Sequence, residues 1–298
     1  MTVIRRLMSD DRPMLDAFLE CHRASSMFLR SNLFYSGLID GPDRFHGLYM
    51  GVFEGGALTD VAAHYWNNNI ILQAPTMPME LACAVAKESG RTVNGVLGPW
   101  TQVKAAEPGL DLDRTRLGKV VPEYLYRLSL DEMVVPEPLS SEAVTHRRAG
   151  HHDLDTLVAW RRVYDHITMG FPEHVIDDER NRAMLSGTID DARLWVLLDG
   201  DTPVAMTGFN ATMPDTVQVG GVFTPEDQRG RGHARSVVAG SLLDAKADGA
   251  VEAILFTEMD NSPAQKAYES LGFEQVGDYG MVVVDPSISD VKKKETQP

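Results

Sequence analysis

Three scarce features limit what this 298-residue chain can be, and the first is cysteine. Cys21 and Cys83 are too few and too far apart for a disulfide framework or a metal site, so we expect both to be buried packing residues. Long apolar runs are also missing, since nowhere do 18 apolar residues follow one another. The first 11 residues carry charges instead of an apolar signal core, so we predict a cytoplasmic chain without a membrane segment.

Basic residues are the third scarcity. Asp and Glu outnumber Lys and Arg 43 to 28, and the formal charge at pH 7 is -15. This charge repels a phosphate backbone and an anionic bilayer, so we expect neither nucleic acid nor a membrane as partner. It would favour a cationic small molecule or a basic peptide, although an acidic surface also simply aids solubility.

The length favours two domains over a single large one. Residues 131–141 contain Pro136, Pro138 and three acidic residues, which is typical of an exposed linker. We therefore predict one domain over residues 1–135, a second over 142–287, and a disordered tail over 288–298.

Hydrophobic periodicity in the C-terminal half predicts alternating strands and helices. Gly249 and Gly272 supply helix stops, and Ser262 is the expected capping residue of the last helix. The expected helices are 153–164, 177–185, 234–248 and 262–271, and the expected strands are 194–198, 203–209, 217–223, 251–256 and 281–284. The N-terminal half repeats part of this order, with strands 48–53, 58–65, 70–72 and 93–97 and helices 78–87 and 100–106. We predict a second, diverged copy of one fold, with chance similarity as the alternative.

The loop from Pro225 to Ala234 carries the clearest chemical signal. It contains two glycines and lies where a helix begins, so its unpaired backbone NH groups and the positive end of the helix dipole can hold an anion. Arg229, Arg231 and Arg235 concentrate positive charge there in an otherwise acidic chain. The lysine and hydroxyl residue of a P-loop are absent, and the third glycine of a dinucleotide fingerprint is missing. Pyrophosphate is the ligand that fits this loop best.

Two motifs in this half resemble those of GNAT-type N-acetyltransferases. The loop matches the family's first signature, an arginine, two further residues, glycine, one residue, and then glycine or alanine. About 30 residues later comes a helix similar to the family's second signature. The matching residues are Arg229, Gly230, Arg231, Gly232, His233 and Ala234 in the first motif, and Asn261, Ala264, Ala267, Tyr268, Leu271, Gly272 and Phe273 in the second.

The resemblance implies a fold and a cosubstrate. The fold class would be α/β (α+β), with two GNAT-like mixed-sheet domains in tandem and central strands splayed for acyl-CoA. Acetyl-CoA would lie with its pantetheine arm along the third strand, where Gly220 and Gly221 fit a bulge. The predicted contacts to the cosubstrate are Val222, Phe223, Thr224, the amides from Arg229 to Ala234, and Asn261. The matching N-terminal loop, residues 73–78, has no glycine and no basic residue, so that copy would be degenerate.

The resemblance also implies the catalytic groups. A backbone NH near Val222 would polarise the thioester carbonyl, and Tyr268 would protonate the departing thiolate. Glu258 is the candidate base and Glu226 a second one. A water chain is the alternative, because Gly220 and Gly221 lack a side chain where some family members carry a glutamate.

These patterns predict acetyl transfer from acetyl-CoA to an amine. A small-molecule amine comes first and a protein amine second. The histidines do not have the spacing of metal ligands, so no metal is expected. The oligomeric state is left open between monomer and homodimer. The alternative function is a non-catalytic module that binds acyl-CoA or an amine and reports on it to a partner.

Overall fold

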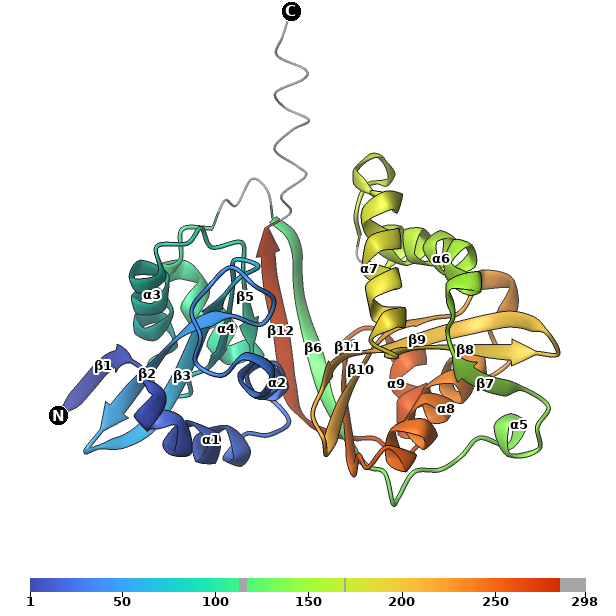
Figure 1. Ribbon diagram of the computed structural model, residues 1–298, viewed down its shortest axis with the longest axis horizontal. Coiled ribbons are helices and arrows are strands. Elements are labelled where there is room, and N and C mark those ends of the chain that lie inside the picture. Colours follow the sequence, from blue (N-terminus) through green and yellow to red (C-terminus); the bar gives the residue numbers. More distant parts are fainter. Residues whose placement is uncertain (113–116, 169, 285–298) are drawn as a thin grey trace, which may run out of the picture. The chain divides into compact units, whose positions relative to one another are not determined.

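The computed structural model describes residues 1–112, 117–168 and 170–284 (Figure 1). The chain forms two compact units, one made of residues 1–125 with the described residues from 277 onward, the other of residues 126–276. Both boundaries fall inside strands, β6 (Leu117–Ser129) and β12 (Glu274–Val284), so each of these strands is divided between the units.

This division differs from the predicted domains 1–135 and 142–287. The expected linker, 131–141, lies within the second unit, where Pro136 and Leu139 are buried and residues 137–140 form a short helix, α5 (Glu137–Ser140). The last strand joins the first unit, because Gly280–Val283 pair antiparallel with Gly95–Gly98. The predicted tail, 288–298, lies outside the described residues.

The first unit is a mixed sheet covered on both faces. Leu48, Met50 and Val52 pack against helices α3 and α4, whereas Tyr49 and Phe53 of the same strand pack against α1 and α2. Burial on both faces explains why this strand is a continuous apolar run. Its strands are β1 (Thr2–Arg6), β2 (Gly47–Glu54), β3 (Ala57–Tyr65), β4 (Asn69–Gln73) and β5 (Gly95–Gly98), in that order, and its helices are α1 (Arg12–Cys21), α2 (Met27–Ser36), α3 (Pro78–Ser89) and α4 (Trp100–Ala106).

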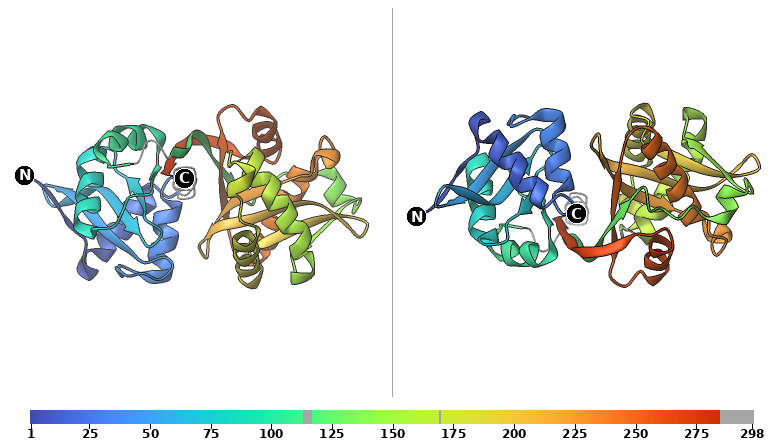
Figure 2. Two further views of the ribbon diagram at one scale, coloured as in Figure 1. Left: turned by 90° about the horizontal axis from the view of Figure 1, so that it is seen from above. Right: turned by 90° about the horizontal axis from the view of Figure 1, so that it is seen from below.

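The second unit has the same plan. Antiparallel strands are followed by a parallel pair, β10 and β11, and helices lie on both faces of the sheet (Figures 1 and 2). Val196 and Met206 face α6 and α7, whereas Trp195 faces α8, where its Nε1 donates a 2.8 Å hydrogen bond to Asp244. The strands are β7 (Thr145–Arg148), β8 (Leu194–Asp199), β9 (Thr202–Thr212), β10 (Thr216–Phe223) and β11 (Glu252–Glu258), and the remaining helices are α6 (Leu154–Ile167), α7 (Asp178–Asp190), α8 (His233–Ala247) and α9 (Ser262–Glu269).

The predicted helices and strands are all present, and two local expectations are wrong. Helix α9 is capped by Asn261 and not by Ser262, because the Asn261 side chain accepts a 3.2 Å hydrogen bond from the NH of Ala264. Cys21 is exposed and Cys83 half-buried, so neither is a buried packing residue.

An ion pair between an arginine and an aspartate stabilises the start of the second unit. Arg147 donates hydrogen bonds of 2.6 and 2.8 Å to the two carboxylate oxygens of Asp153, which also accepts one from the NH of Gly150. Burial alone would raise the pKa of Asp153, but the hydrogen bonds from Arg147 and Gly150 outweigh it, and the pKa is lowered. The pair joins strand β7 to the turn that begins α6.

The first unit contains an equivalent arginine–aspartate ion pair. Arg5 donates hydrogen bonds of 2.7 and 2.6 Å to Asp11, which accepts another from the NH of Met8. The Arg5 hydrogen bond is the main cause that lowers the pKa of Asp11 to about 2. Each of these residues lies 142 positions before its counterpart in the second unit. A shared spacing of three interacting groups supports the tandem repeat at the level of sequence as well as fold.

Asp153→Asn should destabilise the second unit. Because the folded pKa of Asp153 lies below the unfolded value near 4, the carboxylate stabilises the fold above that pH, and this contribution is lost as pH falls. We expect the free energy of unfolding at pH 7 to fall by about 1–3 kcal/mol. Denaturant titration followed by tryptophan fluorescence measures it. Asp155→Asn is the control, because this carboxylate lies in the first turn of α6 and is 91% exposed. Equal effects of the two variants would contradict the stabilising role of the Arg147–Asp153 pair.

Candidate functional site

Strands β10 and β11 separate partway along their length. Among the described residues their parallel pairing runs from Thr216 to Val219, opposite Glu252 to Leu255, yet the strands continue to Phe223 and Glu258. Beyond Val219, the main-chain NH and C=O groups of β10 on this side are not paired with β11 and can accept other partners. The predicted splay of the central strands is therefore present, and Val222 and Phe223 lie along it.

Strand β10 also bulges where it leaves β11. Gly220 pairs with Gly208 of β9 but Phe223 pairs with Met206, so β10 has one residue more than β9 over this stretch. Gly221 takes a φ of +61°, which favours glycine. The bulge predicted at Gly220 and Gly221 is confirmed. Such bulges redirect a strand beside a binding site.

The loop after β10 presents an array of unused donors. Gly230 and Gly232 have φ angles of +77° and +81°, and Gly232 is the N-cap of α8 without a side-chain cap. No described residue accepts a hydrogen bond from the NH groups between Gly230 and Ala234. These groups lie at the positive end of a helix of 15 residues, so the loop can receive an anion.

Buried polar atoms around the same loop also lack a partner within the described residues. They are Thr224 Oγ1, His233 Nδ1, Arg235 Nε and Ser236 Oγ. Buried polar groups are nearly always hydrogen-bonded, so four unpaired atoms beside one loop indicate a place for a polar ligand. Burial, followed by the charge of Arg231, lowers the pKa of His233 and favours its neutral form.

The arginines of the loop add positive charge at its rim. Arg229 and Arg231 are exposed, and Arg229 Nε donates a 3.2 Å hydrogen bond to the carbonyl of Thr224. Arg235 folds back over the loop, since a Cβ built on Gly232 would lie 2.9 Å from its Nε. The donors and the charge fit a pyrophosphate, and a side chain at position 232 would displace Arg235 and crowd the donors.

Tyr268 stands among aromatic residues. Its side chain is 8% exposed, and its ring lies 6.1 Å from that of Phe273 in an edge-on contact. Burial is the main cause that raises the pKa of Tyr268, and Tyr164 of α6 raises it further. The phenol therefore stays protonated at neutral pH, as a proton donor must. Its hydroxyl forms no hydrogen bond within the described residues.

The other predicted residues have structural roles as well. The side-chain oxygen of Asn261 caps α9, which leaves its amide nitrogen as the group that could contact a pantetheine arm. The main-chain carbonyl of Glu258 accepts hydrogen bonds from Asn261 NH and from the Gln265 side chain, and the Glu258 side chain is half-buried. Glu226 is exposed in the turn before the loop.

Sequence reasoning missed the aromatic residues that α6 contributes. Trp160 lies 6.0 Å, between ring centroids, from Phe223, and Tyr164 influences the pKa of Tyr268. The spacing of these two residues at i and i+4 places them on one helix face. That spacing could have indicated an aromatic face of α6 near the site, although it is equally typical of ordinary core packing.

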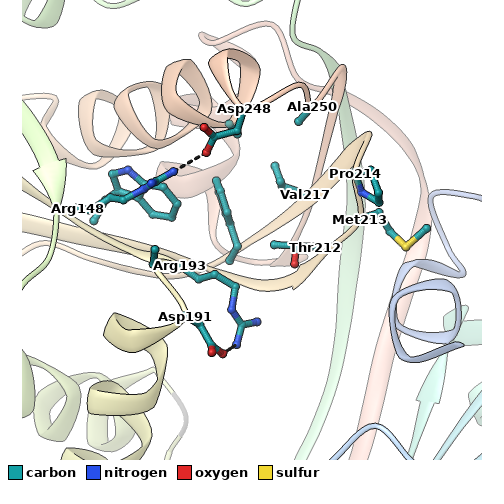
Figure 3. Close-up of a pocket in the computed structure, with 13 residues that line it drawn as sticks. Arg148, Asp191, Arg193, Thr212, Met213, Pro214, Val217, Asp248 and Ala250 are labelled. Atoms are coloured by element: carbon teal, nitrogen blue, oxygen red, sulfur yellow. Dashed lines mark hydrogen bonds and ion pairs between the residues drawn. The ribbon is translucent and has the colours of Figure 1, made fainter. Parts of the chain in front are cut away.

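The cavity in Figure 3 is a different place in the second unit. It has a volume of about 360 Å³ and contains none of the predicted site residues. It is lined by Ala245, in the last turn of α8, and by Asp248, the residue that follows the helix, roughly 20 Å along the helix from the loop at its start. Two ion pairs, Arg148 with Asp248 and Arg193 with Asp191, line it.

The loop in the first unit that corresponds to the donor-rich loop is closed by the protein itself. The carboxylate of Asp60, which is fully buried, accepts hydrogen bonds of 2.8 and 3.0 Å from the NH groups of Thr76 and Met77. Gln102 accepts one of 2.6 Å from Ala74 NH. Asp60 thus occupies the start of helix α3 where an anion would bind, which agrees with the expected degenerate copy.

Comparisons with known proteins agree with this geometry. Residues 160–273 match the family model described as Acetyltransferase (GNAT) family. A stretch of 83 residues is 35% identical to a mycothiol acetyltransferase of Corynebacterium glutamicum (strain R), and it covers 28% of each chain. Among solved structures, a GNAT-family acetyltransferase from Colwellia psychrerythraea is similar with a TM-score of 0.54 at 16% identity, over 95% of this chain and 100% of that one.

A tandem GNAT protein from the clavulanic acid biosynthesis pathway is similar with a TM-score of 0.52 at 11% identity, over 95% of this chain and 98% of that one. Residues 160–273 thus match the GNAT acetyltransferase family model, and the chain shares its fold with these GNAT structures. Within the described ranges, none of the helices has the length and apolar character needed to cross a bilayer. No cluster of three metal-ligating side chains is found in the same part of the chain.

Gly232→Leu should abolish acetyl-CoA binding. A side chain would fill the space at the start of α8, and the φ of +81° adds strain. Isothermal titration calorimetry measures the affinity. Gly56→Leu, at a φ of +91° in the turn between β2 and β3 of the first unit, carries similar strain and is the control. Unchanged affinity of the Gly232 variant would remove the loop from the site.

Acetyl-CoA should bind with a stoichiometry of one per chain. The donors at the start of α8 are open, whereas those before α3 are already satisfied by Asp60. The same calorimetric titration gives the number of sites. A stoichiometry of two would contradict the closed loop in the first unit.

Proposed function

We propose that the second unit transfers an acetyl group from acetyl-CoA to an amine. The observation that carries the proposal is the row of unpaired NH groups from Gly230 to Ala234, with buried polar atoms beside it that lack a partner among the described residues. The separated ends of β10 and β11 supply a place for the pantetheine arm beside Val222, Phe223 and Thr224. The match of residues 160–273 to the GNAT family model supports acyl transfer as the reaction class.

In this mechanism the chain's residues bind, orient and protonate. The loop amides hold the pyrophosphate, and the NH of Val222 polarises the thioester carbonyl. The neutral amine attacks the carbonyl carbon, a C–N bond forms and the C–S bond breaks. Tyr268 gives its proton to the departing sulfur and regains one from solvent, while the amine nitrogen loses a proton to water or to Glu258. The net products are an amide and free coenzyme A.

A small-molecule amine is the proposed acceptor. The net charge of -15 raises the local concentration of cations near the protein. A protein amine is the second candidate, because it carries the same reacting group. The rival to both is a binding module that holds acetyl-CoA without turnover. The hydroxyl of Tyr268, which forms no hydrogen bond within the described residues, favours catalysis, since a module that only binds needs no proton donor.

Release of free thiol from acetyl-CoA tests the function. The full chain is incubated with glucosamine, spermidine, L-lysine or a peptide with a free N-terminus, which represent four kinds of amine. Turnover with any of them above the rate of hydrolysis supports the transferase. Acetyl-CoA binding without turnover on all four would favour the binding module.

Tyr268→Phe should lower turnover by about 10- to 10,000-fold without weakening acetyl-CoA binding, because it removes the proton donor and keeps the ring. The thiol-release rate and the calorimetric affinity are measured together. Tyr35→Phe, at an exposed tyrosine of the first unit, is the control. Equal turnover of the wild type and the Tyr268 variant would mean that Tyr268 serves packing alone.

A further inference from the structure

Strand β9 has an extra residue of its own, opposite the start of the splay. Gln218 of β10 pairs with Ala211, but the next residue, Val219, pairs with Phe209. Asn210 is therefore the unpaired residue of a second bulge. A bulge of this kind re-aims the side chain it carries.

The Asn210 side chain lies over Gly220. A Cβ built on Gly220 would be 2.0 Å from Nδ2, 2.6 Å from Cγ and 2.8 Å from Oδ1 of Asn210. The carboxamide thus takes the space that any side chain at position 220 would need. Gly220 is also the first residue of β10 beyond its pairing with β11, so Asn210 lies at the mouth of the splay.

The carboxamide is available to a ligand. Asn210 is exposed, and within the described residues its side chain has no hydrogen-bond partner. An amide offers one acceptor oxygen and two donor hydrogens, and it does not titrate in the physiological range. It can orient a nucleophile but cannot take its proton.

The position lies on the face of the sheet that carries the aromatic residues of α6. Gly220 is paired with Gly208, and a Cβ on Gly208 would lie 3.2 Å from the Leu194 side chain. Leu194 belongs to the core cluster that packs β8 and β9 against α6 and α7. Residues directly opposite in an antiparallel pair point to the same face, so positions 208 and 220 share the face of Leu194. Because the Asn210 side chain lies over Gly220, it is on that face of the sheet as well.

We infer that Asn210 positions the attacking amine in the reaction proposed above, on which this inference rests. Its Oδ1 accepts a hydrogen bond from the neutral amine, and this aims the nitrogen lone pair at the thioester carbon held beside Val222. The C–N bond forms as the C–S bond breaks, and the amine proton goes to solvent water. Gly220 lacks a side chain because the carboxamide of Asn210 fills that space.

The test compares Asn210→Ala and Asn210→Asp with the wild type and with Thr202→Ala, an exposed position at the start of the same strand. Thiol release is measured with glucosamine and with spermidine from pH 6 to 9, acetyl-CoA affinity by calorimetry, and folding by thermal denaturation. Asn210→Ala should lower kcat/KM for the amine by about 10- to 100-fold, the usual effect of one lost hydrogen bond to a reacting group. Acetyl-CoA affinity should stay within about twofold, since the residue does not contact the loop.

Asn210→Asp separates positioning from a structural role. Its carboxylate keeps the shape and can also accept the amine proton, so its rate should exceed that of the Ala variant and fall less steeply below pH 7. With water in place of an amine, hydrolysis of acetyl-CoA should rise above the wild-type rate. These changes need a side chain that faces the nucleophile.

The outcomes separate the two proposals. A wild-type chain that binds no acetyl-CoA refutes the proposed function, and the role of Asn210 with it. A chain that binds acetyl-CoA and transfers acetyl groups, but whose Ala variant matches the wild type within about twofold, refutes only the role of Asn210. If neither amine is acetylated, unchanged hydrolysis in the Asp variant overturns the inference and increased hydrolysis supports it.

Discussion

The proposed chemistry depends on backbone NH groups at the start of α8 that have no hydrogen-bond partner among the described residues. A helix N-terminus always has such groups, and a chain must satisfy them with a cap, water or a ligand. Here Gly230 and Gly232 adopt left-handed conformations that keep side chains away from the donors. The adjoining bulge in β10 lies where this strand leaves β11. Loop and strand together form the surface on which we propose that a long, anionic thioester binds.

The two units solve one physical problem in opposite ways. In the first, the Asp60 carboxylate neutralises the start of α3 from within the core. In the second, no described residue accepts a hydrogen bond from the equivalent donors. The first unit thus closes from within the position that the second leaves for a ligand, while both units keep the arginine–aspartate pair.

Local features of this chain could be predicted from sequence, whereas pairings between distant residues could not. The donor-rich loop is contiguous, and its glycines and arginines indicated both its position and its ligand class. Helix α2 gave no periodic signal, because residues 29–33 are all buried and include Arg30 and Asn32. Three features depend on strand register, which composition does not encode. They are the contact of Asp60 with residues 76 and 77, the position of the Asn210 side chain over Gly220, and the pairing of β12 with the first unit.

The sharing of β12 has a consequence for synthesis on the ribosome. Strand β5 ends at Gly98, but its partner in β12 begins only near Gly280. At about 5–20 residues per second, the ribosome needs roughly 10–40 s to make the intervening stretch. During that interval the nascent first unit exposes an unsatisfied strand edge, of the kind that chaperones shield and that neighbouring chains can invade. Its sheet is completed only after all of the second unit has been translated.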